Sequence, residues 1–395
     1  MKVLHVYKTY FPDTPGGLQE AIRQISLHTS KHGVESKIFC LSKNPSPKKI
    51  KTEEGEIIRS KSWFSPGHND MGLIDSFLEF RALVKWADIL HFHFPWPFAD
   101  LLYLFSFIRK KSVMTYHSDV VGKGILSKLY NPLMKFMLNR MDIIVATSPR
   151  YLDSSKVLKN IKNKKKLKYI SLGLDKKEYQ KHENEIDDKK ILNKFKLKKN
   201  KYFLFIGVLR KYKGLDFLFP ASNLVDFKIA IAGATQPGDL DTGNFYIEES
   251  KKYKNISMIG EVSNTEKICL IKNSKGLVLP SHLRSEAFGI VLLEAAIYGK
   301  PLVSCEIETG TSFANLDNYS GIVVNPEDPT LLANAMKKIY LNEELATKFG
   351  NNARKRFDDL FTADKMGSSY LNVYKKLIDK DNKNSKTNVF KGTRD

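Results

Sequence analysis

Cysteine and long apolar runs are both scarce in this sequence. The three cysteines, Cys40, Cys269 and Cys305, are scattered, which favours neither a disulfide framework nor a metal site. No apolar run reaches the roughly 18 residues of a membrane-spanning helix. The opening MKVLHVYKTYFP is a short strand pattern and not a signal peptide. We therefore expect neither a disulfide-stapled secreted domain nor an integral membrane protein, and we predict a cytoplasmic location.

Acidic residues are few relative to basic ones. The chain has 64 Lys+Arg against 43 Asp+Glu, a formal net charge of +21. Such an imbalance favours an anionic partner: nucleic acid, an anionic membrane surface or phosphorylated substrates. Lysine-rich codon usage is the alternative that needs no partner. Because no nucleic-acid motif is present and the lysines are not interleaved with aromatic residues, we expect no nucleic acid among the partners. A basic nucleic-acid-binding protein stays the alternative from a different class.

The sequence is long enough for two domains and alternates strand patterns with helix patterns. Its 395 residues suit two domains of roughly 150–200 residues each. Buried strand patterns such as VLHVY and YFLFIGV are followed by loops and helical patterns, which predicts an α/β fold with parallel sheets. A highly charged segment near the middle predicts a linker. The expected parts are a domain at 1–185, a domain at 186–365, a helix at 366–380 packing back on the first domain, and a disordered tail at 381–395.

The most informative stretch is SHLRSEAFGIVLLEAAIYGKPLVS, residues 281–304. Glu286 and Glu294 are eight positions apart, a little over two helical turns, so both carboxylates fall near one line on a helix face. Gly289 lets the backbone approach a ligand, and the N–H groups at the helix start favour an anion. A carboxylate beside an anion site suits a ligand with hydroxyls and phosphates, such as a sugar nucleotide. On spacing alone, a solvated glutamate pair on an ordinary helix explains the pattern equally well.

With its flanking strand patterns LVLPS and KPLVS, this stretch resembles the retaining glycosyltransferases of the two-Rossmann-domain (GT-B) class, family 4 type. Their signature is a Glu, seven residues and a second Glu, with Phe-Gly just after the first. The opening VLHVYKTYFPDTPGG and the segment TYHSD are similar to bacterial O-antigen and polysaccharide mannosyltransferases. The resemblance implies two Rossmann-like domains facing across a cleft, the first binding the acceptor and the second the sugar nucleotide.

The resemblance also implies roles for particular residues. Glu286 orients the donor sugar, and Glu294 holds the ribose. Lys213 and Arg210 neutralise the departing diphosphate, an electrostatic contribution of the kind that usually dominates such chemistry. His117, which ends the strand pattern SVMTYH, contacts the donor sugar. Without the resemblance, His117 would suit a buried structural histidine, and the two cations a solvated basic loop.

One position departs from the family pattern. The family has an arginine directly after the glycine that ends this strand, whereas Val208 follows Gly207 here and Arg210 lies two residues later. Whether Arg210 replaces the family arginine stays open. The family's Gly-Gly loop, its base-binding backbone and the start of the signature helix supply the other substrate-binding candidates. Together the substrate-binding candidates are Gly16, Gly17, Gly207, Val262, Phe288, Gly289, Ile290, Val291 and Glu294.

Two groups of potential metal ligands are present, and we assign neither to a metal. His91 and His93 share one face of a strand pattern, but no third ligand at a helpful spacing is visible, which favours core or cleft-lining histidines. Asp239 and Asp241 superficially form the acidic pair of metal-dependent glycosyltransferases, but their Gly/Pro/Asp-rich context favours a surface turn. We therefore predict a metal-independent enzyme with no cofactor, whose donor substrate is the sugar nucleotide.

The resemblance implies transfer of a hexose with retention, by front-face attack of the acceptor hydroxyl and without a protein nucleophile. Mannose from GDP-mannose is the leading donor, and the acceptor is a lipid-linked saccharide of O-antigen or surface polysaccharide synthesis. The alternatives are a transferase that uses a UDP-sugar (HexNAc, Glc or Gal) and a GT-B sugar-nucleotide epimerase. Acceptor, linkage and oligomeric state stay open.

A lipid-linked acceptor implies a place on the inner membrane face. Three basic segments of the first half are expected to hold the protein peripherally on an anionic membrane surface. They are the polar loop with Lys48, Lys49 and Lys51, the helix end at Arg109, Lys110 and Lys111, and the amphipathic helix at 123–140. By itself, the amphipathic pattern favours a core helix with a solvated basic face over a helix on a membrane surface.

Overall fold

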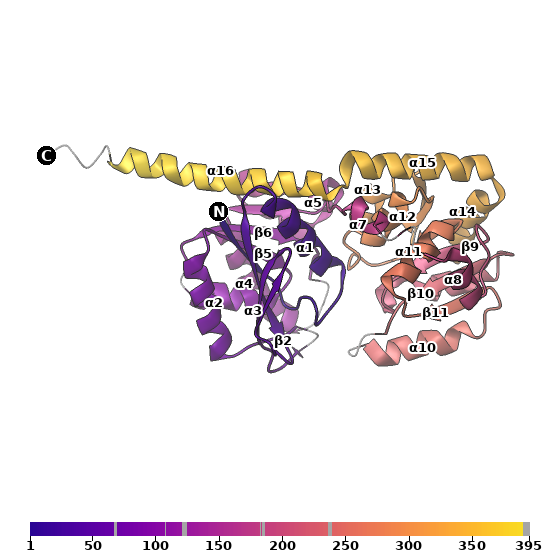
Figure 1. Ribbon diagram of the computed structural model, residues 1–395, viewed down its shortest axis with the longest axis horizontal. Helices are drawn as coiled ribbons and strands as arrows, with labels where there is room; N and C mark the ends of the chain where they lie inside the picture. Colours follow the sequence, from indigo (N-terminus) through magenta and orange to yellow (C-terminus); the bar gives the residue numbers. More distant parts are fainter. Residues whose placement is uncertain are drawn as a thin grey trace. The chain divides into compact units, whose positions relative to one another are not determined.

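The computed structural model describes residues 1–66, 69–106, 108–120, 125–181, 183, 186–235 and 239–389, without the side chains of 125–128 and 380–389. The chain divides into two compact units (Figure 1). Unit 1 comprises Met1–Thr147, Ser155–Gly173 and the C-terminal segment from Ala363, and unit 2 comprises Ser148–Ser154 and Leu174–Thr362.

The boundary between the units differs from the expected one at residue 185, which lies outside the described residues. Leu174 forms an isolated parallel bridge with Thr362, and its N–H donates to the carbonyl of Phe361 over 3.0 Å. These backbone contacts assign the chain from Leu174 onward to unit 2. The charged segment that predicted a linker therefore belongs to the second unit.

Unit 1 is built on an eight-stranded sheet in the order β3-β4-β2-β1-β5-β6-β7-β8. Neighbouring strands are parallel except β3 and β4, which pair antiparallel at one edge. The strands are β1 Lys2–Val6, β2 Glu35–Ser42, β3 Lys49–Thr52, β4 Gly55–Lys61, β5 Ile89–Phe94, β6 Lys111–Tyr116, β7 Ile143–Ala146 and β8 Leu167–Tyr169. Residues 49–52 are thus an edge strand, where the sequence predicts a polar loop; exposed lysines suit such an edge because they discourage pairing with other strands.

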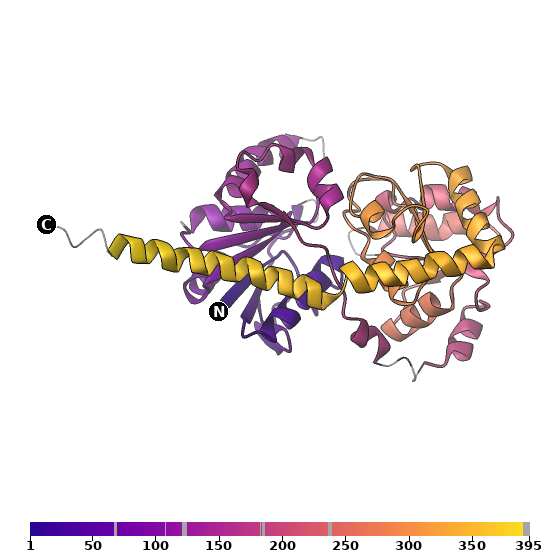
Figure 2. The ribbon, with the colours of Figure 1, turned by 90° about the horizontal axis from the view of Figure 1, so that it is seen from above.

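The helices of unit 1 include α1, which packs against the last helix, α16. Their bounds are α1 Gly17–Ser30, α2 Ile74–Trp86, α3 Pro97–Phe105, α4 Ile125–Arg140, α6 Lys156–Lys159, η2 Lys164–Lys166 and α16 Ala363–Val389. The yellow helix α16 crosses unit 1 along its sheet (Figure 2). The tail expected from 381 is helical as far as Val389, because residues added to an existing helix need no new nucleation; residues 390–395 lie outside the described part.

Unit 2 is built on a six-stranded parallel sheet in the order β11-β10-β9-β12-β13-β14. Its strands are β9 Tyr202–Ile206, β10 Lys228–Ala232, β11 Ile256–Gly260, β12 Gly276–Leu279, β13 Leu302–Cys305 and β14 Gly321–Val324. Its helices are α5 Pro149–Ser154, α7 Lys176–Gln180, α8 Asp188–Lys194, η4 Lys211–Lys213, α9 Leu215–Ser222, α10 Leu240–Ser250, α11 Asn264–Asn273, α12 Ile290–Ile297, α13 Thr311–Ala314, α14 Pro329–Leu341 and α15 Glu343–Leu360.

The two sheets confirm the predicted α/β class. Among the parallel strands of each sheet the order reverses at one place, between β1 and β5 in unit 1 and between β9 and β12 in unit 2. Ligands of such sheets bind beyond the carboxyl ends of the strands at this reversal. The loops after β9 and β12 are therefore the place to look for a site in unit 2. Among the described helices, none combines the length and apolar character that crossing a membrane requires.

Candidate active site

The loops that follow β9 and β12 are in direct backbone contact. The N–H of His282 donates to the carbonyl oxygen of Tyr212 over 3.1 Å. Gly214 has a φ of 77°, and a Cβ there would lie 2.0 Å from the carbonyl oxygen of Pro280. Only glycine combines this left-handed backbone with such a close approach. The short helix η4, which ends at Lys213, is thereby held against the loop that carries Glu286.

A buried ion pair joins the two loops. The Lys213 ammonium group donates to Oε2 of Glu286, and the two side chains are only 12% and 11% exposed. The Ser281 hydroxyl donates to the same Oε2 over 3.2 Å, and the Thr309 hydroxyl donates to the Glu286 backbone carbonyl over 2.8 Å. Burial by itself lowers the pKa of Lys213, but the nearby Glu286 carboxylate and Tyr212 raise it above its ordinary value. The lysine is therefore charged at neutral pH.

The Lys213–Glu286 pair can bind two kinds of ligand group, phosphates and hydroxyls, at one place. Lys213 provides a fixed positive charge for phosphate oxygens, and the Glu286 carboxylate accepts hydrogen bonds from hydroxyls. Gly207 lies beside the ammonium group, since a Cβ there would be 3.7 Å from Nζ of Lys213. The structure thus brings together Gly207, Lys213 and Glu286, three residues that the sequence predicts for one site.

The helix start after Glu286 has the predicted form. Gly289 precedes α12 with a φ of 78°, and a Cβ on it would lie 2.7 Å from Cδ2 of Leu279. Ile290 and Val291 form the first turn of α12, where the N–H groups have no earlier carbonyl partner within the helix. Phe288 is buried. Donors at the start of a helix suit a phosphate group.

Glu294 lies within α12 and is buried. Its Oε1 accepts a hydrogen bond from the Tyr179 hydroxyl over 2.8 Å and one from Nζ of Lys267 over 2.7 Å. Sequence reasoning missed both partners. Lys267 follows the predicted base-binding Val262 by five positions and could have been suspected, whereas Tyr179 lies in the charged segment that predicted a linker and carries no local signal.

Arg210 forms an ion pair that corrects one expectation. Its Nε donates to Oδ2 of Asp239 over 2.7 Å. Asp239 immediately precedes α10, and Asp241 lies in the first turn of that helix, so these residues do not form the expected surface turn. A carboxylate is favourable at a helix start because it faces the positive end of the dipole. The role of Arg210 toward a diphosphate stays a prediction.

The remaining predicted glycines and Val262 follow a strand and lie at or just before the start of the next helix. Gly16 and Gly17 follow β1 and begin α1, at the strand reversal of unit 1. Val262 follows β11 and is half-buried just before α11. Their places in the fold agree with ligand-binding roles, which stay predictions.

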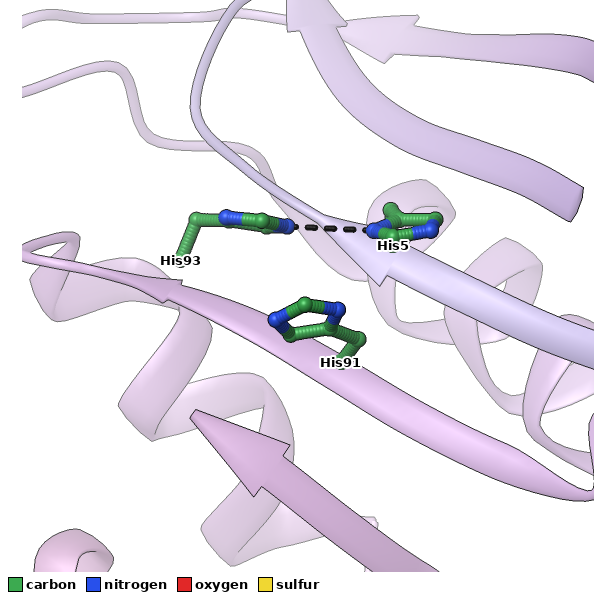
Figure 3. Close-up of side chains that lie close together, drawn as sticks. All are labelled: His5, His91 and His93. Carbon is green, nitrogen blue, oxygen red and sulfur yellow. Dashed lines mark hydrogen bonds between the residues drawn. The ribbon is translucent and has the colours of Figure 1, made fainter. Parts of the chain in front are cut away.

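His117 is the last member of a chain of buried histidines in unit 1. Nδ1 of His5 and Nε2 of His93 are 3.1 Å apart (Figure 3), and Nδ1 of His93 and Nε2 of His117 are also 3.1 Å apart. Burial lowers the pKa of His5 and of His117 to about 3, and it lowers the pKa of His93 well below its ordinary value. All three imidazoles are therefore neutral. The sequence indicated His93 and His117 but not His5, whose place beside them depends on the pairing of β1 with β5.

A three-histidine group could in principle hold a metal. Candidate ligand nitrogens of His5, His91 and His93 all lie within 4.8 Å of one another. Both nitrogens of His91 are already engaged, however: Nδ1 is 2.6 Å from the Tyr374 hydroxyl, and Nε2 is 2.7 Å from the Thr115 hydroxyl. A divalent ion would break these bonds, and the group contains no carboxylate to offset its buried charge. The prediction that His91 is a core histidine is the better fit to this geometry.

Two Rossmann-like sheets, parallel throughout in unit 2 and parallel except for the edge strand β3 in unit 1, define the GT-B class of protein. Solved structures agree on this fold. Sucrose-phosphate synthase from Thermosynechococcus elongatus matches with a TM-score of 0.78 at 18% identity, over 95% of this chain and 99% of that one. The complex of Anabaena HepE with UDP-glucose matches with a TM-score of 0.73 at 15% identity, over 95% and 100%.

Sequence comparisons then identify the family. The model of "Glycosyltransferase Family 4" matches residues 15–178, and that of "Glycosyl transferases group 1" matches residues 187–356. O-antigen chain mannosyltransferase C of Escherichia coli is 37% identical over 379 residues, 96% of this chain and 99% of that protein. D-rhamnosyltransferase WbpZ of Pseudomonas aeruginosa is 38% identical over 364 residues, 92% and 93% of the two chains. The chain therefore belongs to the group 1, family 4 glycosyltransferases, and the predicted enzyme class is confirmed.

Proposed function

We propose that this enzyme transfers a hexose with retention from a nucleoside-diphosphate sugar to a lipid-linked saccharide of O-antigen or other surface polysaccharide synthesis. GDP-mannose is the leading donor. The observation that carries the proposal is the buried Lys213–Glu286 pair at the strand reversal of unit 2, which matches a ligand bearing both phosphates and hydroxyls. The similarity to O-antigen chain mannosyltransferase C supports mannose, and the similarity to WbpZ makes a D-rhamnose nucleotide the second candidate donor.

In this proposal the residues of unit 2 hold the donor. The start of α12 and Lys213, with Arg210, bind the diphosphate and neutralise it as it leaves. Glu286 orients the sugar and Glu294 accepts hydrogen bonds from the ribose. In unit 1, His117 contacts the transferring sugar. The acceptor hydroxyl attacks the face from which the diphosphate departs, so no side chain acts as a nucleophile.

The donor and the independence from metal are tested together. Thermal-shift titrations with GDP, UDP and ADP and with their sugars should show the largest rise in melting temperature for GDP or a GDP-sugar, because binding to the folded state stabilises it. Transfer from GDP-mannose to a lipid-linked acceptor should persist in EDTA, since Lys213 and Arg210 supply the charge that a metal ion supplies elsewhere.

Three outcomes would contradict parts of this proposal. Loss of transfer on chelation, restored by Mn²⁺ or Mg²⁺, would return attention to Asp239 and Asp241. Conversion of the sugar nucleotide without an acceptor would indicate an epimerase. A preference for UDP-sugars in both binding and turnover would replace the GDP-linked donor.

Membrane attachment is a further part of the proposal, and unit 1 offers it an apolar surface as well as basic ones. Around the start of α2, several large apolar side chains are exposed. Phe64 forms an isolated antiparallel β-bridge with Met71, shortly before α2. The centre of the Phe105 ring lies 6.2 Å from that of Phe77 in α2. The exposed members are Trp63, Phe64, Leu73, Ile74, Leu78 and Phe105. Apolar side chains of this size are favourable in the interfacial region of a bilayer.

Vesicle binding should therefore depend on salt and on the β3 edge. We expect the protein to bind phosphatidylglycerol-containing vesicles at low salt, and binding to weaken as salt screens the contacts within a Debye length of roughly 8–10 Å. Reversing Lys48, Lys49 and Lys51 to Glu should weaken binding further, since each lysine near the surface contributes roughly 1 kcal/mol. Lys48 and Lys49 are exposed, and so is Lys51. Co-sedimentation is the measurement.

A matched control lies in unit 2. Lys198, Lys199 and Lys201 are exposed, and their reversal changes the net charge equally. Equal loss of binding in both triple variants would indicate an effect of net charge alone. No binding by the wild type even at low salt would end the membrane proposal and favour a soluble acceptor. Arg109–Lys111 are further candidates, but they follow the end of α3 at Phe105 and reach the first residue of β6, so they are not the expected helix end. The described part of the basic helix, up to Arg140, is another candidate, whereas Lys123 lies outside the described residues.

A further inference from the structure

Four buried histidines in or next to the sheet strands of unit 1, His5, His91, His93 and His117, form two separate hydrogen-bonded sets. His91 is held by Thr115 and by Tyr374 of α16. The other three form a line, in which His93 lies between His5 and His117 and each gap is 3.1 Å. Each of these three side chains is at most 3% exposed. The line therefore runs from His5 in β1 to His117, the proposed sugar-contacting residue, and is shielded from solvent along its length.

Neutral imidazoles constrain such a line strongly. A neutral ring has one N–H donor and one lone-pair acceptor, so the rings must all point their donors the same way along the line. Only two arrangements are then possible. In one, His5 donates from Nδ1 to His93, and His93 donates from Nδ1 to Nε2 of His117, which leaves the proton of His117 on Nδ1. In the other, every proton is on the opposite nitrogen.

The free end of the line distinguishes these arrangements. Nε2 of His5 is buried and has no hydrogen-bond partner among the described residues. In the first arrangement this atom is a bare acceptor; in the second it is a buried N–H without an acceptor. Orphaned buried N–H groups are rarer than under-satisfied acceptors. The first arrangement is therefore favoured.

We propose that His93 and His5 are positioning residues that hold His117 in the tautomer protonated on Nδ1. The ring nitrogen of His117 outside the line is then a fixed hydrogen-bond donor, suited to an oxygen of the transferring sugar. The contact between this N–H group and the sugar rests on the proposed function, whereas the tautomer of His117 does not. Preorganisation of this kind avoids reorienting the ring when the substrate binds.

The tautomer is measured directly by long-range ¹H–¹⁵N correlation spectra of the full chain labelled at histidine, with signals assigned by single substitutions. His117 should show the Nδ1–H pattern. His93→Asn places a side-chain amide near the position of the His93 Nδ1 atom, so His117 should keep its Nδ1–H pattern. His93→Gln places its amide toward His5 instead, so His117 should lose the single tautomer, and His93→Phe should have the same effect.

The same variants separate positioning from folding. Transfer by His93→Gln and His93→Phe should fall roughly tenfold in kcat/KM, about the value of one hydrogen bond, and His93→Asn should restore most of it. His91→Gln alters a buried histidine two residues away that is not in the line, and it should leave both the His117 tautomer and transfer unchanged.

Three results would overturn the inference. The first is the Nε2–H pattern at His117, and the second is a His117 signal that is the same in all His93 variants. The third is a joint shift of His5, His91 and His93 on adding Zn²⁺, which would make the cluster a metal site. Absence of transfer by the wild type would instead count against the proposed function, because the spectra decide the tautomer without any activity.

Discussion

Replacing Glu286 by alanine is expected to reduce transfer at least roughly a hundredfold, the scale on which losing one preorganised charged group affects a reaction. The carboxylate is the proposed partner of the sugar hydroxyls, and it holds Lys213 in place. Initial rates with saturating donor and acceptor are the measurement. A folded Glu286→Ala protein with wild-type turnover would refute the assignment.

The ion pair adds a cost in stability that the sequence did not reveal. Removing one partner of a buried pair leaves the other charge uncompensated, which typically costs about 3 kcal/mol. We expect Glu286→Ala to lower the free energy of unfolding by this order, and the double variant Lys213→Met/Glu286→Gln to recover stability but not transfer. Glu343→Gln is the matched control, because Glu343 pairs with Lys275 elsewhere in unit 2 and is 81% exposed; it should retain transfer.

Gly214→Ala is expected to destabilise unit 2 by roughly 3–5 kcal/mol and to abolish transfer. A left-handed φ of 77° is unfavourable for alanine, and the added Cβ would lie 2.0 Å from the Pro280 carbonyl oxygen. The loop that carries Lys213 would have to move away from the loop that carries Glu286. Urea unfolding followed by a probe in unit 2 measures the first effect.

Gly260→Ala is the control that separates the two costs of Gly214→Ala, the unfavourable backbone conformation and the steric clash of the added Cβ. Gly260 has a similar φ of 82° in the same unit, but a Cβ there would meet no atom within 4 Å. Only the conformational cost of about 1–2 kcal/mol is expected. Equal losses of stability for the two alanine variants would show that the loops after β9 and β12 are not packed as described.

Local patterns predicted the parts of the site that lie close together in the chain. The Glu286–Glu294 spacing, the glycine before α12 and the cations after β9 were each visible because one loop or one helix contains them. Arg210 shows the limit of this reasoning, since its partner Asp239 follows the next strand, in a Gly/Pro/Asp-rich context that by itself predicts a surface turn. Tyr179, Lys267 and His5 were missed because their partners are distant in sequence.

The sequence by itself determined the class of the fold, the family and the identity of the main polar groups, because strand periodicity, helix-start chemistry and a short signature all act over a few residues. The tertiary structure decided which of these groups meet. Parallel sheets place the ends of non-consecutive strands side by side, so strand order alone joins Lys213 to Glu286 and His5 to His93. Burial then decided their charge states: it keeps the histidines neutral, whereas the adjacent carboxylate keeps Lys213 charged.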